Sequence, residues 1–203
     1  MAKFEIRNTF SVAVGVFSMT EYLPYMRRVF EQAELSTTVE GHKTTLSSYD
    51  SLSFGHTKDF GVGEEAEEFK KAIVNRCVNY LDFLNIDCSG KELVIKNLWL
   101  NEMVSGATHR RHSHYGSLFS GCIYVDLPVD SSGITLYNPS DRYDRIPTNY
   151  NRFHSANSGL WTYHPEEGDI FVWESYLHHS VEMSHFEGVR RSIAFDLILK
   201  DEE

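Results

Sequence analysis

The pattern of hydrophobic and polar positions divides the chain into a helical first part and a strand-rich second part. Apolar residues recur at the spacing of an amphipathic helix in two stretches, Met19–Leu35 and Glu64–Leu84. Thr20 is the expected N-cap of the first helix, and Pro24 lies in its first turn. Two further stretches complete this part: an expected strand at Phe10–Phe17, and expected irregular or edge-strand structure at Leu35–Phe60.

From Lys91 onward the pattern changes to the alternation that is typical of β-strands. Strands are expected at Leu93–Met103, Leu118–Leu127, Gly133–Tyr137, Leu160–Tyr163, Asp169–Trp173, Leu177–Met183 and Val189–Leu199. Because these short strands follow one another without an intervening helix, they predict a mainly β sandwich or barrel with the N-terminal helices packed on it. We expect one domain over residues 1–203, with a mixed helical part at 1–90 and the β core at 91–200.

One long polar connection, residues 138–159, interrupts the series of strands. Long loops inside compact domains often carry function, so this loop is a candidate lid. Its basic side chains are Arg142, Arg145, Arg152 and His154.

Composition narrows the class of protein. The net charge is −10, from 19 basic and 29 acidic residues, which argues against a general nucleic-acid or anionic-membrane binder. Cys77, Cys88 and Cys122 lie far apart, without the spacing of a cysteine zinc site or a disulfide framework. No apolar run reaches transmembrane length, and the first residues lack the apolar core of a signal peptide. The expected location is therefore cytoplasmic, with no membrane or nucleic-acid partner.

Histidine residues gather in two segments of the expected β core. His112 and His114 are separated by one residue, so their side chains project to the same side of an extended chain. Two neutral imidazoles on one face are what a transition-metal site requires from one segment. The second segment holds His178 and His179, and alternation places His179 on the apolar face of its strand. His109 is a ligand candidate only if its segment is helical, which the strand pattern argues against.

The last strand carries a candidate anion clamp. Arg190 and Ser192 share one face of this strand, and Arg191 lies on the other. A guanidinium can grip a carboxylate with two bonds while a hydroxyl two residues away donates one more. The arginine follows His179 by 11 residues (190 minus 179), so in a barrel the clamp would lie beside the metal. A register slip of one residue would instead turn Arg190 to the solvent.

Taken in order, these motifs resemble the 2-oxoglutarate/iron(II)-dependent (2OG-Fe(II)) oxygenases, and most closely a prolyl-hydroxylase-like group within them. The resemblance covers about residues 97–197. The segments that carry it are HSHY at 112–115, SGCIY at 120–124, WESYLHHSV at 173–181, and Arg190 with Ser192 in the last strand.

The resemblance implies a double-stranded β-helix (jelly-roll, cupin-like) fold with Fe(II) as the metal and 2-oxoglutarate as the co-substrate. It assigns His112, His114 and His179 as metal ligands, and Arg190 with Ser192 as the partners of the distal carboxylate. Asn101, Ser120 and Tyr124 are further candidates, either to contact 2-oxoglutarate as cofactor-binding residues or to orient the metal ligands. Ascorbate is a further candidate cofactor.

The sequence departs from the wider superfamily at His114, where the usual H-x-D/E motif has a carboxylate. Two alternatives stay open: a three-histidine centre, or a site in which a carboxylate or water takes that position. The implied activity is the oxidation of a C–H bond in a small-molecule or peptide substrate, with decarboxylation of 2-oxoglutarate to succinate.

Two other functions compete with the oxygenase. One is a three-histidine cupin-type metalloenzyme that does not use 2-oxoglutarate, and the other is a non-catalytic jelly-roll binding module. The pair of Arg190 and Ser192 favours the oxygenase, because neither alternative needs a dicarboxylate clamp beside the metal.

Overall fold

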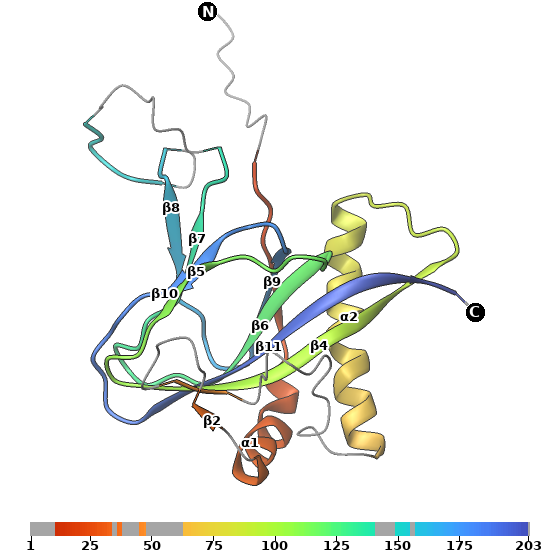
Figure 1. Cartoon of the computed structure of the whole chain (residues 1–203), viewed down its shortest axis with the longest axis horizontal. Helices are drawn as coiled ribbons and strands as arrows, with labels where there is room; N and C mark the ends of the chain where they lie inside the picture. The colour runs from red at the N-terminus through yellow and green to blue at the C-terminus, as the bar shows by residue number, and fades with distance from the viewer. Residues whose placement is uncertain are drawn as a thin grey trace, which may run out of the picture.

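Two antiparallel β-sheets face one another across a cavity, and two helices cover the other side of the larger sheet (Figure 1). The computed structural model describes residues 11–33, 36–37, 45–47, 63–140, 149–154 and 157–202. This arrangement confirms the prediction of a mainly β jelly-roll fold with N-terminal helices packed on it.

Within the described ranges, the larger sheet contains seven strands in the order β1 (Gly15–Ser18), β9 (Asp169–Glu174), β6 (Phe119–Asp126), β11 (Val189–Asp201), β4 (Lys91–Val104), β3 (Thr45–Ser47) and β2 (Ser36–Thr37). The smaller sheet contains β5 (His109–His112), β10 (His179–Val181), β7 (Ile134–Tyr137) and β8 (Leu160–Tyr163). All of the observed strand pairs are antiparallel. The N-terminal part therefore supplies edge strands to the same sheet as the β core.

The first helical stretch is shorter than predicted. A 3-10 turn at Thr20–Tyr22 leads into α1 (Leu23–Gln32), and residues 34–35 of the predicted helix lie outside the described residues. The prediction that Thr20 caps this helix is wrong, because its hydroxyl pairs with that of Ser18 at 2.8 Å and Tyr22 holds the N-cap position. Pro24 lies in the first turn, as predicted. The second helix, α2 (Glu64–Phe83), agrees with the prediction.

Several predicted strand boundaries also need correction. The strand predicted at Phe10–Phe17 is β1 at Gly15–Ser18, and residue 10 lies outside the described residues. The strand predicted from Leu177 begins only at His179, because the Leu177 N–H closes a turn by bonding to the carbonyl of Glu174. Strand β5 was not among the predicted strands. Its extended backbone agrees with the expectation of an extended chain at His112.

Alternation along the central strands separates the hydrophobic core from the cavity. On the helix side, Phe119 of β6 packs edge-on against Tyr80 of α2, with ring centroids 5.0 Å apart. The same core takes residues of one parity from the central strands: Leu98, Leu100, Ile123, Val125, Ile170, Val172, Ile193, Phe195 and Leu197. Residues of the opposite parity, including Asn101, Tyr124 and Ser192, face the smaller sheet. The helices therefore stabilise the wall on which the site is built.

Gly121 permits a close approach between two of these central strands. It lies opposite Phe195 in the pairing of β6 with β11, and a Cβ atom at position 121 would lie only 2.1 Å from Phe195 Cζ. Glycine is therefore required here by space rather than by backbone conformation.

Of the helices in the described ranges, none combines the length and apolar character that a membrane crossing needs.

Candidate metal and co-substrate site

Three histidines from different segments converge at one end of the cavity. His112 ends β5, His179 begins β10, and the two residues lie opposite one another in the smaller sheet. His114 follows β5, and its backbone N–H bonds to the Ser175 carbonyl at 3.0 Å. One ligand atom from each of the three side chains lies within 4.8 Å of the other two. The predicted grouping of His112, His114 and His179 is therefore present in the fold.

The three imidazoles each place the same ring nitrogen, Nδ1, against an oxygen atom. Nδ1 of His112 lies 2.7 Å from the Arg110 carbonyl, and Nδ1 of His179 lies 3.1 Å from the Leu177 carbonyl. Nδ1 of His114 lies 2.6 Å from Oδ1 of Asp196. Because these partners accept hydrogen bonds, each Nδ1 carries the proton and each Nε2 offers a lone pair. This is the donor set that a divalent transition metal requires.

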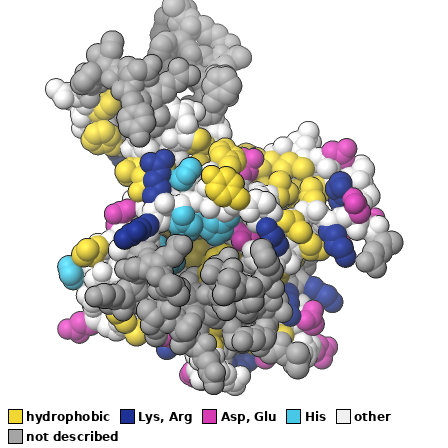
Figure 2. Space-filling model, viewed as in Figure 1, with side chains coloured by type: hydrophobic (Ala, Val, Ile, Leu, Met, Phe, Trp, Pro, Cys, Tyr) yellow, Lys and Arg dark blue, Asp and Glu magenta, His cyan; other side chains and the backbone are white. Residues whose placement is uncertain are grey.

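Electrostatics keep the buried member of the cluster neutral. Burial lowers the pKa of His179 well below 6.5, and the neighbouring His112 and His114 lower it further. His178, the next residue back, is exposed, so the strand alternation selected the inward residue of the pair correctly. Histidine side chains gather on the face shown in Figure 2, in agreement with the partial exposure of His112 and His114. The metal end of the cavity is therefore accessible from the surface.

The most important residue that the sequence analysis missed is Asp196. This residue is 4% exposed, and its carboxylate accepts hydrogen bonds from His114 Nδ1, from Ser120 Oγ at 2.7 Å and from Asn97 Nδ2 at 3.0 Å. Burial would raise the pKa of this carboxyl group, but the bonds from His114, Asn97 and Ser120 outweigh that effect and lower it. The sequence held one signal for this residue: Asp196 is polar and lies on the same face of the last strand as Arg190 and Ser192.

The structure corrects the prediction that Ser120 contacts the co-substrate. Ser120 does not line the cavity, because its hydroxyl lies behind His114 and donates to Asp196. The hydroxyl of Ser175 also lies 2.7 Å from it. This place suits the alternative that was predicted for Ser120, an indirect effect on ligand orientation.

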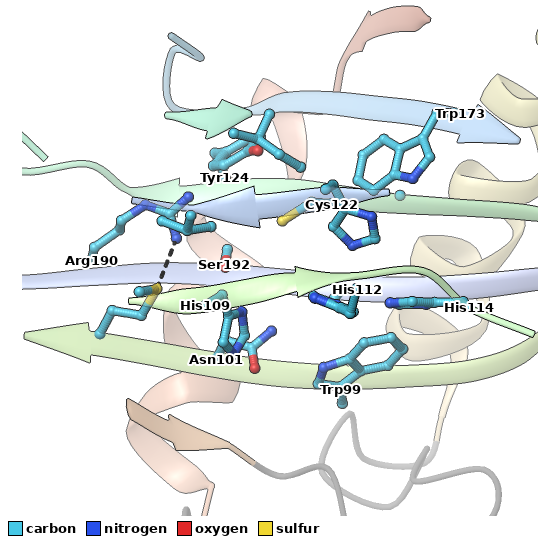
Figure 3. Close-up of a pocket in the computed structure, with 16 residues that line it drawn as sticks. Trp99, Asn101, His109, His112, His114, Cys122, Tyr124, Trp173, Arg190 and Ser192 are labelled. Atoms are coloured by element: carbon cyan, nitrogen blue, oxygen red, sulfur yellow. Dashed lines mark hydrogen bonds between the residues drawn. The ribbon is translucent and has the colours of Figure 1, made fainter. Parts of the chain in front are cut away.

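Arg190 lies in the cavity wall and is 2% exposed (Figure 3). Its Nε donates to the Ser132 carbonyl at 3.1 Å, and its Nη1 lies 3.5 Å from Met103 Sδ. Among the described residues, no carboxylate forms an ion pair with it. A buried guanidinium without an anionic partner is costly, so this arrangement favours an anionic ligand.

Arg191 shows that the strand register is the predicted one. It points to the other face of β11, where its guanidinium donates to Glu102 at 2.6 Å and to Asp126 at 3.3 Å. Ser192 is buried and lines the cavity with Arg190. The alternative register, in which Arg190 would face the solvent, is wrong.

Polar atoms without partners line the same cavity. Within the described part of the chain, Asn101 Oδ1, the Tyr124 hydroxyl and Trp173 Nε1 are buried and make no hydrogen bond. Burial raises the pKa of Tyr124 well above 10, so its hydroxyl stays protonated and can donate. Asn101 and Tyr124 were predicted as candidate cofactor-binding residues, whereas Trp173 was not. Buried polar atoms normally have partners, so a polar ligand is expected here.

His109 also lines the cavity, which the sequence analysis did not anticipate. Between His109 and His112 the pairing of β5 with β10 contains a bulge, because two residues of β5, Arg110 and Arg111, lie opposite one residue of β10, Ser180. The bulge lets His109 face the cavity together with His112, although the two residues are an odd number of positions apart. The segment does not have to be helical for this. Cys122 also lines the cavity, and burial raises the pKa of its thiol.

The candidate lid is described only in part. Residues 141–148 and 155–156, including Arg142 and Arg145, lie outside the described residues. Arg152 and His154 are exposed. The role of this loop stays a prediction.

Comparison with known proteins agrees with this site. Residues 97–196 match the family model described as "Putative 2OG-Fe(II) oxygenase". This segment runs from Asn97 to Asp196 and contains the three histidines and Arg190. No curated protein matches the chain by sequence.

Solved structures share the fold at low sequence identity. A prolyl-4-hydroxylase from Pseudomonas putida aligns with a TM-score of 0.57 and 13% identity, over 92% of each chain. HygX from Streptomyces hygroscopicus, with nickel and 2-oxoglutarate bound, aligns with a TM-score of 0.60 and 13% identity, over 92% of this chain and 82% of that one. An oxidoreductase of the 2OG-Fe(II) oxygenase family from Burkholderia pseudomallei aligns with a TM-score of 0.59 and 12% identity, over 88% and 79%. Through residues 97–196 and the jelly-roll fold around them, this chain belongs to the 2OG-Fe(II) oxygenase family.

Proposed function

We propose that the protein is an Fe(II)- and 2-oxoglutarate-dependent dioxygenase that hydroxylates a C–H bond, with decarboxylation of 2-oxoglutarate to succinate. One observation carries the proposal: three imidazoles whose ligand atoms lie within 4.8 Å of one another stand at one end of a cavity, and the wall of this cavity also holds a buried arginine that forms no ion pair among the described residues. A metal-binding group and a carboxylate-binding group in one cavity suit a ligand that chelates the metal and carries a second carboxylate. 2-Oxoglutarate is such a ligand.

His112, His114 and His179 would hold the iron through Nε2. Iron, 2-oxoglutarate and O2 supply the oxidising chemistry when they are bound, and the protein supplies binding, orientation and exclusion of water. The carbonyls of Arg110 and Leu177 and the carboxylate of Asp196 fix the imidazole tautomers. The side chains therefore need little rearrangement on metal binding.

Arg190 would bind the distal carboxylate of 2-oxoglutarate, and Ser192 would donate a further hydrogen bond to it. Both residues are buried, and the Arg190 guanidinium carbon lies 5.3 Å from the centre of the Tyr124 ring. The unpaired Tyr124 hydroxyl and Trp173 Nε1 are further donors to the bound keto acid, whose oxygens would give these atoms partners.

Apolar side chains from both sheets would keep water from the bound co-substrate. Trp99 and Met103 of β4 and Trp173 of β9 are buried in the cavity wall, and Ile134 of β7 closes it from the smaller sheet. A dry cavity strengthens the attraction between Arg190 and a carboxylate, because water no longer screens the two charges.

The choice of cofactors is supported by the family match and by HygX, whose solved structure contains nickel and 2-oxoglutarate. The reaction type is a separate matter, since the structural neighbours include a prolyl-4-hydroxylase and an epimerase, SnoN. Hydroxylation of a small molecule or peptide is our proposal for this chain. Ascorbate stays a predicted additional cofactor.

A visible titration tests the proposal directly. Anaerobic protein loaded with Fe(II) is titrated with 2-oxoglutarate, and we expect a metal-to-keto-acid charge-transfer band. His179→Ala should abolish the band and weaken metal binding by about 100-fold or more, because a direct ligand contributes more than an outer residue. The matched control is His178→Ala, which removes the adjacent exposed imidazole and should leave the band unchanged. Admission of O2 should then yield succinate.

One observation favours a second candidate, the three-histidine cupin-type enzyme that does not use 2-oxoglutarate. Among the described residues, the metal cluster contains histidines only and no carboxylate. If iron binds and His179→Ala removes it, but 2-oxoglutarate produces no band, this second candidate replaces the oxygenase. If no metal binds, both enzymes are rejected in favour of a binding module.

A further inference from the structure

In the described part of the chain, the histidine cluster contains no negatively charged group that could balance the charge of a bound cation. Its three ligand groups are neutral imidazoles, so a bound divalent cation would keep its full charge in the inner ligand set. Among the described residues, Asp196 is an anionic group that contacts the cluster, and its Oδ1 lies 2.6 Å from His114 Nδ1. We infer that Asp196 is a positioning residue that fixes His114 and supplies the metal site, through the imidazole, with the negative charge that its inner ligands lack. This inference rests on the proposed metal-binding function.

Asp196 is held in place as an anion by its own partners. Oδ1 accepts bonds from His114 and Ser120, and Oδ2 accepts one from Asn97 at 3.0 Å. These donors come from separate segments, so the carboxylate is fixed from several directions. A buried carboxylate with three donors is stabilised in its charged form.

A bulge in β4 supports the same arrangement. Asn97 pairs with Asp196, but the next pair is Ile95 with Leu197, so Lys96 is an extra residue in β4. Lys96 Nζ donates to the Gly116 carbonyl at 2.9 Å and thereby anchors the turn that follows His114. The Trp99 ring lies 5.8 Å from the His114 ring at an interplanar angle of 33°. Strand β4 therefore contacts both the carboxylate, through Asn97, and the imidazole that pairs with it, through Trp99.

The chemical effect follows from the shared proton. A carboxylate that accepts the Nδ1–H bond draws positive charge toward itself and makes Nε2 a stronger electron donor. The metal then becomes more electron-rich than it would be with three isolated imidazoles. A purely structural role predicts a different result, because any acceptor of the same shape would then serve as well as a carboxylate.

Asp196→Asn separates these two roles. The amide keeps an acceptor for His114 Nδ1 but removes the charge, and the Asn97 amide can reverse to accept from the new NH2 group. We expect Co(II) affinity to fall by about 10- to 100-fold. We also expect the charge-transfer band of the anaerobic Fe(II)–2-oxoglutarate complex to move to shorter wavelength, because a less electron-rich iron gives up its electron at higher energy. Asp196→Glu, which restores the charge, should move both values back toward the wild type.

Ser120→Ala provides a second test that does not alter the carboxylate. It removes one donor to Oδ1, so Asp196 should pull harder on the His114 proton and shift the band to longer wavelength. Thermal unfolding of each metal-free variant checks that it is folded. If Asp196→Asn does not fold, the wavelength shift in Ser120→Ala decides whether the charge of Asp196 acts on the metal site.

The outcomes separate this inference from the proposed function. If wild-type protein binds no Co(II) or Fe(II), both fail. If the wild type binds metal and forms the band, but folded Asp196→Asn has the same affinity and wavelength, only the charge role of Asp196 fails. The same conclusion follows if Ser120→Ala leaves the wavelength unchanged.

Discussion

Replacement of Arg190 by methionine should weaken 2-oxoglutarate binding without destabilising the ligand-free protein. Arg190 is 2% exposed, and among the described residues no carboxylate forms an ion pair with it. Loss of one member of a buried, hydrogen-bonded charge pair costs about 2–5 kcal/mol. At about 1.4 kcal/mol for each factor of ten, the Kd for 2-oxoglutarate should rise roughly 30- to 4000-fold.

The ligand-free protein should respond in the opposite sense. Arg190→Met gives up the bond to the Ser132 carbonyl, which contributes about 1 kcal/mol. It also removes a buried charge whose desolvation costs several kcal/mol, at an order-of-magnitude level. The free energy of unfolding of the metal-free variant should therefore equal or exceed that of the wild type. Many charged residues that are buried for structural reasons show the reverse, because their removal leaves a partner unpaired.

Arg191→Met is the matched control, since Arg191 is the next residue of the same strand and points the other way. Its ion pairs with Glu102 and Asp126 are partly buried, so its loss should lower the free energy of unfolding by about 1 kcal/mol. The affinity for 2-oxoglutarate should not change. Urea unfolding of the metal-free proteins and calorimetric titration of the Ni(II)-loaded proteins with 2-oxoglutarate measure both quantities. The argument is refuted if Arg190→Met binds within about threefold of the wild type, or if both variants lose affinity equally.

Three further predictions follow from buried groups. Tyr124→Phe removes a buried hydroxyl that has no hydrogen-bond partner among the described residues, so the metal-free protein should keep its stability while 2-oxoglutarate affinity falls about tenfold in calorimetry. Unchanged affinity would show that the hydroxyl makes no contact with the ligand. Gly121→Ala places Cβ against Phe195 and should cost more than about 2 kcal/mol in urea unfolding, and a smaller cost would mean that the two strands can separate. Burial raises the pKa of Cys77 to about 12, so iodoacetamide at about pH 8.5 should find a neutral, enclosed thiol. Mass spectrometry should show modification of half-buried Cys88 but not Cys77 until urea is added, and equal rates would contradict the packing of α2. The same pKa shift should lower the free energy of unfolding as the pH rises above 9.0, the value for an unburied thiol.

Local periodicity was enough to predict much of this fold and part of its site. The apolar stripe of α2 and the alternation of β6 and β11 depend on which side chains share a face, and neighbours in sequence determine that. The same alternation distinguished His179 from His178 and Arg190 from Arg191, because adjacent residues of a strand face opposite sides.

Capping and strand ends were predicted less well, because they depend on competing local bonds. Thr20 has the side chain of an N-cap, but it pairs with Ser18 and the helix begins later. The backbone of Leu177 closes a turn and delays the start of β10 until His179. A difference of one hydrogen bond, about 1 kcal/mol, is enough to move such a boundary.

The sequence alone thus determined that the core is mainly β, that His112 and His114 lie on one side of their segment, and that His179 and Arg190 face inward, since each of these follows from alternation within a single segment. Only the tertiary structure decided that His114 meets Asp196, 82 residues away, and that a bulge brings His109 to the cavity. Cross-strand register and bulges are set by the packing of the whole sheet, and no single segment contains that information. The carboxylate next to the histidine cluster was visible in the sequence as a residue, but its partner was decided only by the way in which the strands pack together.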